Sequence, residues 1–164
     1  EKLLVDGSSI TIDPPAADAF PISRGLGFWI KRFSNTAETS VYLKGQVTTA
    51  NQATAIATGL NLVGYGYTEA LELNGSAVSW TGANGGTGNT TTSDKIMVVN
   101  SDGTFTEYYF FTCPAGWTDA KYTALNNKWI NNNYTLANVT IPAGKGFWYL
   151  RRGASGFIFR PKGN

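Results

Sequence analysis

Few residues of this chain are of the types that catalyse reactions at neutral pH. The sequence holds no histidine and one cysteine, Cys113. Without imidazole there is no Ser–His–Asp triad, no Cys–His pair and no histidine metal site. A single cysteine also excludes an internal disulfide and a zinc site of several thiolates. We expect Cys113 to be a small buried side chain, with an intermolecular disulfide as the alternative.

Carboxylates are the remaining candidates for acid–base chemistry. A glycosidase needs two opposed acids about 5–10 Å apart. Asp13 and Asp18 flank a Pro-Pro pair, and Glu107 falls in the middle of an expected strand. Glu69 and Glu72 would share a face if their segment is helical. None of these acids has a recognisable catalytic context, so we expect a protein that is not an enzyme and that uses no cofactor.

Two loop segments have the composition of ligand sites. Residues 81–92 are rich in Gly, Thr and Asn, but they lack the Lys-Ser/Thr ending and following helix of a phosphate-binding loop. Asp94, Asn100 and Asp102 carry oxygens that suit calcium, but not at EF-hand spacing. Residues 100–103, Asn-Ser-Asp-Gly, have instead the composition of a hairpin turn. We therefore expect no metal site, and an exposed loop or interaction surface at 81–92.

The overall composition is typical of a folded β protein. The 164 residues are 42% hydrophobic and 13% aromatic, which is enough for a packed core. Charged residues make up only 15% and the net charge is +2, too little for a protein that binds duplex nucleic acid. No apolar run approaches the roughly 18 residues of a membrane helix. We expect neither a nucleic-acid partner nor a membrane span.

Strand-like segments recur along the chain, separated by turn residues. Helical patterns are weak and short. The sequence predicts an all-β fold, an antiparallel β-sandwich or barrel-like domain with one or two short helical turns. Hairpin turns are expected at 100–103 and 152–156. The expected strands lie at 8–12, 27–33, 40–47, 60–65, 95–99, 104–111, 146–151 and 156–160, and the weak helical patterns at 50–57, 68–73 and 118–125.

One pattern occurs twice. Residues 24–32 and 143–151 share five of nine residues, around the common core Gly-x-Gly-Phe-Trp. This match indicates an internal duplication, with a partial repeat at 1–50 and a full repeat at 51–164. Alternation places Phe147, Tyr149 and Arg151 on one face of a strand and Trp148 and Leu150 on the other. Because both faces are apolar, we expect a central strand that is covered on both sides.

The longer copy resembles a known kind of module. It opens with Gly59-Leu60-Asn61-Leu62-Val63-Gly64-Tyr65, passes Trp80 and closes with Ile141-Pro142-Ala143-Gly144-Lys145-Gly146-Phe147-Trp148. This order is similar to a β-rich repeat of secreted and surface-anchored bacterial proteins that opens GxNLVxxPY and closes PGxGYW. The present chain has Gly66 where a Pro is common. The resemblance implies an extracellular β module and brings no catalytic residues with it.

The favoured function is a self-assembling extracellular structural subunit, which forms a filament or fibre with copies of itself. A half repeat leaves an unpaired strand edge and an uncovered apolar face, which a strand or face of the next subunit would complete. The expected donor is the N-terminal segment, which has a strand pattern and no obvious local partner. We expect the protein at the cell surface or outside the cell after removal of a signal peptide. The expected interface residues are Leu3, Leu4, Val5, Ile10 and Ile12.

The alternative is a carbohydrate-binding or adhesin module on a bacterial surface. It requires an exposed, coplanar pair of aromatic rings, for which Trp80, Trp117 and Trp129 are candidates because they fall in loop-like contexts. Asn-x-Ser/Thr sequons could also carry glycan on a surface protein. The sequons lie at Asn74, Asn89, Asn133 and Asn138.

Overall fold

The molecule is built almost entirely from β-strands. The structure is a computed structural model that describes residues 2–5, 8–11, 25–29, 50–87 and 91–161. Within this part, every pair of named strands is antiparallel and the only helix has four residues. The expected all-β class is therefore confirmed, while closure into a sandwich or barrel stays a prediction.

The strands are β1 (Lys2–Val5), β2 (Ser8–Thr11), β3 (Thr54–Ile56), β4 (Gly59–Gly64), β5 (Leu71–Glu72), β6 (Val78–Ser79), β7 (Lys95–Val99), β8 (Phe105–Phe111), β9 (Lys128–Ile130), β10 (Thr140–Ile141), β11 (Gly146–Arg151) and β12 (Phe157–Pro161).

The largest sheet has five strands in the order β4-β11-β7-β8-β9. Strand β11 lies inside this sheet, with β4 on one side and β7 on the other. Its alternating residues point to opposite faces, and Phe147, Tyr149 and Arg151 are all buried. Trp148 and Leu150, on the opposite face, are only half-buried. The central position expected for this strand is found, but full cover is found on one face alone.

The buried face of this sheet meets the remaining strands in one core. The three-stranded sheet β3-β12-β6 contributes Ile56 and Phe159, and the β10-β5 pair contributes Ile141. Trp80, just after β6, stacks on Phe159 with ring centroids 4.9 Å apart and on Tyr149 at 6.2 Å. Burial of each such side chain stabilises the fold by about 1.5–3 kcal/mol. These aromatic contacts hold the two layers together.

The Gly-rich run at 81–92 lies against β8 over its described part. Gly86 donates its N–H to the carbonyl of Phe110, and its own carbonyl accepts from the N–H of Thr112. A Cβ added to Gly85 would collide with the Thr112 side chain. The glycines thus allow a close approach of two backbones.

The two expected hairpin turns have different outcomes. The turn at 100–103 joins β7 to β8 as a hairpin, with the Asn100 N–H 2.8 Å from the Thr104 carbonyl and Gly103 at φ 83°. The turn at 152–156 does not form a hairpin, because β12 pairs with β3 and β6 and not with β11. This segment crosses between the two layers, which allows Phe159 to be fully buried in the core.

Two of the three helical segments predicted from weak patterns are wrong. The segment 50–57 contains β3, and the segment 68–73 contains β5. Each of these strands buries an aliphatic side chain in the core, Ile56 and Leu71, and such packing outweighs a weak local propensity. Only 118–125 is helical, as α1 (Ala120–Thr123), whose first turn is capped by Asp119 accepting from the Lys121 N–H at 2.8 Å.

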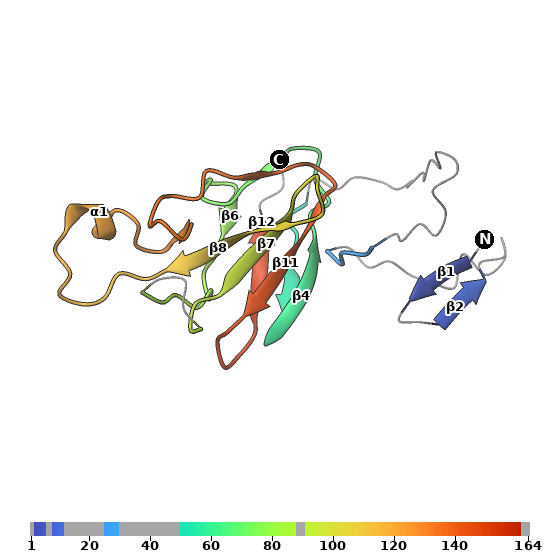
Figure 1. The fold of residues 1–164 in the computed structure, drawn as a ribbon, viewed down its shortest axis with the longest axis horizontal. Coiled ribbons are helices and arrows are strands. Elements are labelled where there is room, and N and C mark those ends of the chain that lie inside the picture. The colour runs from blue at the N-terminus through green and yellow to red at the C-terminus, as the bar shows by residue number, and fades with distance from the viewer. Residues whose placement is uncertain (1, 6–7, 12–24, 30–49, 88–90, 162–164) are drawn as a thin grey trace.

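The N-terminal strands form a hairpin of their own. In β1 and β2, Leu3 pairs with Ile10 and Leu4 with Ser9, and neither strand belongs to another sheet. The expectation that this segment has no local partner is therefore wrong. Figure 1 shows the hairpin at one end of the molecule, apart from the sheets, with α1 at the opposite end. Of the expected interface residues, Ile12 lies outside the described residues.

The first Gly-x-Gly-Phe-Trp segment lies along the free edge of β4. Leu26 forms an antiparallel bridge with Val63, the Gly27 N–H donates to the Leu62 carbonyl at 3.1 Å, and the Gly64 N–H donates to the Gly25 carbonyl at 2.9 Å. The second such segment, in β11, pairs with the other side of β4. One strand therefore has a Gly-x-Gly-Phe-Trp segment on each side.

Candidate functional site

The side of the five-stranded sheet that faces away from the core is apolar and open. We call it the outer face. Strand register aligns its residues in adjoining rows: Leu60 lies opposite Leu150, and Leu62 opposite Trp148. Trp148 in turn lies opposite Met97 of β7, and Val99 of β7 opposite Phe105 of β8. Leu60 is 56% exposed and Phe105 is 48% exposed. Leu60 and Phe105 lie at opposite corners of the outer face, and half-buried apolar residues of β4, β11 and β7 lie between them. A continuous apolar surface of this kind is typical of interaction surfaces.

Two tryptophans stack at the β4 end of the outer face. The rings of Trp29 and Trp148 have centroids 6.5 Å apart and planes 27° apart. Gly27 lies between Trp29 and the β4 edge, and a Cβ there would come within 2.5 Å of the Leu62 side chain. This glycine lets the first segment lie close enough for Trp29 to reach Trp148. Trp29 is 54% exposed, so most of one ring faces solvent.

A polar group borders the apolar part of the outer face. Lys95 Nζ lies 2.9 Å from Glu107 Oε2, which also accepts from the Tyr109 hydroxyl at 2.7 Å. The hydrogen bond from Lys95 holds the pKa of Glu107 below its usual value. Burial and the Glu107 contact raise the pKa of Tyr109 to about 12. The cation and the carboxylate neutralise each other, so this border adds no net charge to the outer face.

The far end of the outer face is covered. A second hydrophobic cluster packs there, formed by Phe111, Leu125 and Ile130 with Tyr122 and Tyr134 against it. Its residues come from β8, β9 and the segments around α1. Beyond the polar border the outer face is therefore covered, whereas over β4, β11 and β7 its side chains are half-buried or exposed and no described segment packs on them as a second layer. We call this part the bare part of the outer face.

Both outer edges of the five-stranded sheet have partners. At β4 the partner is the backbone of Gly25 and Gly27. At β9, Asn74 Oδ1 accepts from the Trp129 N–H at 2.9 Å, and the Ala137 N–H donates to the Trp129 carbonyl at 2.9 Å. Backbone groups that already have partners cannot pair with an added strand. The described partners occupy the second half of the β4 edge and Trp129 of the β9 edge, which favours an approach by the face of the sheet.

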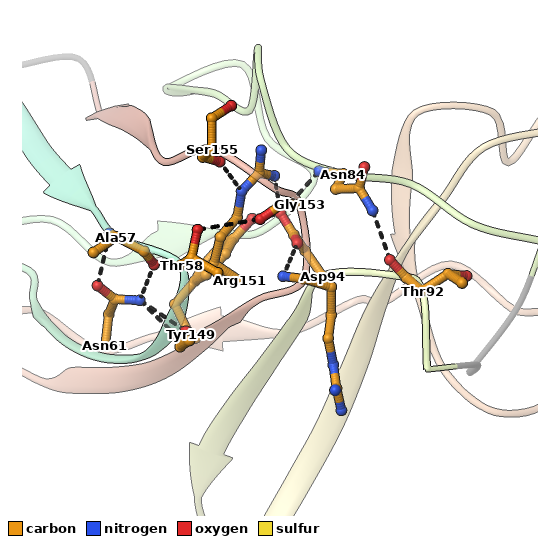
Figure 2. Close-up of polar contacts among 12 residues, drawn as sticks. Ala57, Thr58, Asn61, Asn84, Thr92, Asp94, Tyr149, Arg151, Gly153 and Ser155 are labelled. Carbon is orange, nitrogen blue, oxygen red and sulfur yellow. Dashed lines mark hydrogen bonds and ion pairs between the residues drawn. The ribbon is translucent and has the colours of Figure 1, made fainter.

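A buried carboxylate fixes the opposite face. Asp94 is fully buried, and its Oδ2 accepts from Arg151 at 2.6 Å, from the Tyr149 hydroxyl at 2.7 Å and from the Asn84 N–H at 2.8 Å. Its Oδ1 accepts from the Arg152 N–H at 2.7 Å. Figure 2 shows these contacts meeting at Asp94 from segments far apart in the sequence.

The Asp94 cluster holds the end of β11 in place, because Tyr149, Arg151 and the Arg152 N–H all donate to one carboxylate. Arg151 also donates from Nε to the Ser155 carbonyl at 2.8 Å, which ties the strand to the turn toward β12. Burial and the Asp94 carboxylate raise the pKa of Tyr149 far above its usual value. Four protein donors occupy the Asp94 oxygens, so the described contacts account for the carboxylate without a ligand. Breaking such a buried pair from one side is strongly destabilising.

One cleft opens on the other layer. Its volume is 480 Å³, and Asn74, Trp80 and Lys128 are among its lining residues. The polar groups of Asn74 are already used, because its amide donates to the carbonyls of Trp129 and Ala137. The Trp80 indole N–H likewise donates to the Leu73 carbonyl at 2.7 Å. These groups face the protein and leave the cleft without a convergent set of polar contacts.

The three predicted platform tryptophans do not come together as a coplanar exposed pair. Trp129 is fully buried, and its indole N–H has no partner. Trp80 is half-buried and meets Trp129 edge-on at 75°. Trp117 is 42% exposed and packs edge-on against Tyr122 near α1. The exposed Trp29 stacks instead on the half-buried Trp148. The sequence predicted cover on both faces of the strand that holds Trp148, because both faces are apolar.

The sequons differ in accessibility. Asn74 is held by both its amide and its carbonyl oxygen, so a glycan on it would break the β9 edge. Asn133 and Asn138 are exposed. Asn89 lies outside the described residues.

The other candidates for chemistry stay apart. Glu69 and Glu72 are exposed and share no helix, since Glu72 belongs to β5. Cys113 is half-buried and free. Asp13 and Asp18 lie outside the described residues. In the part of the chain that the structure describes, no three His, Cys, Asp or Glu side chains cluster as metal ligands, and no helix is long and apolar enough to cross a membrane.

Compared with protein-family models, with curated proteins and with solved structures, the chain has no significant match.

Proposed function

We propose that this protein is a non-enzymatic structural subunit that works outside the cell and assembles with copies of itself. The observation that carries the proposal is the bare outer face. Leu60, Phe105 and Trp29 are each about half exposed or more, and strand register adjoins them to further apolar residues of β11 and β7. Exposing a patch of this kind to water is unfavourable, and a partner that covers it gains the corresponding free energy.

The N-terminal hairpin gives a second line of support. Strands β1 and β2 pair only with each other among the described residues. A two-stranded hairpin is marginally stable by itself in water and needs a surface to pack on. The same chain therefore has a hairpin that gains stability from packing and an apolar face on which it could pack. Copies of the chain could associate repeatedly in this way. Contacts between two unlike surfaces generate open filaments when the rotation between copies does not close a ring, whereas self-complementary contacts generate closed dimers.

The sheet edges favour association by a face over association by strand addition. Gly25 and Gly27 pair with one edge of the large sheet, and Asn74 with Ala137 occupies the other. From the sequence, either a strand or a face of the next subunit could complete the half repeat. The pairing at the sheet edges supports association through a face.

The test compares the full chain with a variant that lacks residues 1–11. Light scattering coupled to size exclusion gives the mass in solution, and negative-stain microscopy reveals filaments. We expect the full chain of 17.6 kDa to assemble with increasing concentration and the truncated chain to stay at its own, smaller monomer mass. Equal unfolding midpoints at low concentration would show that the truncation leaves the sheets intact. A full chain that is monomeric at every concentration would contradict the proposal.

A second candidate function is carbohydrate binding, and the exposed aromatic rings favour it. Trp29 and Trp117 each expose a large part of an indole ring, and such rings can stack on the apolar face of a sugar. The test is a polysaccharide pull-down with Trp29→Ala and Trp117→Ala variants. Binding that is lost in one variant and kept in the other would identify the platform, and no binding by the unaltered protein would exclude this function.

A further inference from the structure

We propose that the bare part of the outer face is the docking site for the β1–β2 hairpin of a second copy of this chain. The inference rests on the proposed self-assembly and names both of its surfaces. The acceptor surface is defined by Leu60 and Leu62 of β4, Trp148 and Leu150 of β11, Met97 and Val99 of β7, Phe105 of β8, and Trp29.

The chemistry of the acceptor surface selects an apolar partner. Its charged neighbours, Lys95 and Glu107, already pair with each other at 2.9 Å. This pair therefore adds no net charge to the acceptor surface, and the acceptor residues themselves are apolar. The hairpin has a matching composition, since its register sets Leu3 opposite Ile10 and places Val5 on the same face of the ladder.

We assign the occupant to another copy. In the structure, the chain's own hairpin lies apart from the sheets (Figure 1), and Leu60 and Phe105 are about half exposed. A hairpin from a second copy would cover these side chains, and that copy would offer its own bare face to a third. The contact is therefore heterologous and repeats from copy to copy.

The ring geometry favours a protein partner over a sugar. Trp29 and Trp148 stack on each other with planes 27° apart and centroids 6.5 Å apart. Trp148 is half-buried beside apolar neighbours, so Trp29 is the more exposed ring of the two. Tryptophan and methionine are enriched at the centres of protein interfaces. We therefore expect the two tryptophans and the leucine and methionine side chains beside them to pack on aliphatic residues such as leucine and isoleucine.

The first experiment changes the acceptor surface in the full chain. In Leu60→Glu, a charge replaces the most exposed leucine of the outer face. The matched control is Leu136→Glu, because Leu136 is also exposed but lies in the loop after β9. We expect Leu60→Glu to weaken self-association at least about tenfold by sedimentation velocity, because docking would bury an unpaired charge. Leu136→Glu should leave self-association unchanged.

The second experiment asks whether the contact forms between copies. Leu3→Cys and Leu60→Cys are placed in separate chains, each with Cys113→Ser, and the two are mixed under mild oxidation. We expect a disulfide-linked pair of unlike chains, and much less of it when Leu136→Cys replaces Leu60→Cys. Placing both cysteines in one chain at high dilution tests the alternative, in which the hairpin docks on its own subunit.

The outcomes separate this inference from the proposed function. If truncation of residues 1–11 abolishes assembly but Leu60→Glu does not weaken it, the subunit still assembles and the acceptor surface is wrong. If the full chain never assembles, both fail. A disulfide that forms only within one chain overturns docking between copies. Sugar binding that is lost in Trp29→Ala, without any self-association, assigns the outer face to a glycan and overturns the inference.

Discussion

The two Gly-x-Gly-Phe-Trp segments have the same core sequence and opposite surroundings. Phe147 of the second segment is 1% exposed, and Phe28 of the first is 40% exposed. Trp148 is half-buried and Trp29 is largely exposed. Both segments pair with β4, one on each side. The second segment has β7 as a further neighbour, whereas no described strand pairs with the outer side of the first.

The difference shows that position in the sheet, and not the motif, decides burial. A strand inside a sheet that is backed by a second layer has its inner side chains covered, and Phe147 packs edge-on against Phe159 of that layer. The first segment lies at the sheet edge, where Gly25 is buried against Gln52 and Thr54 but Phe28 and Trp29 are exposed to solvent. The buried copy supports the fold, and the exposed copy is available to a partner.

The largest expected effect compares the two phenylalanines directly. Phe147→Ala should lower the free energy of unfolding by about 3–5 kcal/mol, because it opens a cavity among fully buried side chains. Phe28→Ala should lower it by less than about 1 kcal/mol, because Phe28 is already in partial contact with water. Urea unfolding of the two variants measures both values. Similar losses would contradict the contrast between the segments.

A slightly smaller effect is expected from the Asp94 cluster. Among the described residues, this cluster contacts the second Gly-x-Gly-Phe-Trp segment and not the first. Asp94→Asn removes the charge that Arg151 pairs with at 2.6 Å and should cost about 3 kcal/mol of stability, since it leaves a buried guanidinium without its counter-ion. The control is Glu72→Ala at an exposed site, expected within about 0.5 kcal/mol of the unaltered protein. Equal stability of Asp94→Asn and the control would show that hydrogen bonds suffice.

A smaller loss of stability is expected from alanine at the first glycine of each segment. Gly25 and Gly144 both have positive φ, 83° and 72°, so alanine at either site should cost about 1 kcal/mol in backbone strain. A Cβ on Gly25 would also collide with the side chains of Gln52 and Thr54, whereas none lies near Gly144. We therefore expect Gly25→Ala to be more destabilising than Gly144→Ala in thermal unfolding. The reverse order would mean that residues 25–29 pack weakly on β4.

The smallest effect is a pH dependence at the border of the outer face. Because the Lys95 hydrogen bond lowers the pKa of Glu107, the charged form stabilises the fold above the usual pKa of 4.5, and this contribution is lost as pH falls through the lower folded-state pKa. The unaltered protein should exceed Glu107→Gln in stability by at most about 1 kcal/mol at pH 7. The difference should shrink toward pH 3. A constant difference would exclude titration of Glu107 as its cause.

The sequence by itself determined the class of fold and much of its local structure. Alternation predicted β7, β8 and β11, and Asn-Ser-Asp-Gly predicted the hairpin turn at 100–103. These features depend on residues within a few positions of one another, because the side-chain period and the turn preferences are local properties. The central place of β11 followed from the same argument, since both of its faces are apolar.

Only the tertiary structure decided which aromatic residues are covered and which are exposed. Asp94 meets Arg151 from 57 positions away, and Trp29 stacks on Trp148 across β4. The turn at 152–156 crosses between layers, although its composition equally suits a hairpin. Local patterns carry no information about such distant partners. The candidate site was therefore visible only after the strands had been placed side by side.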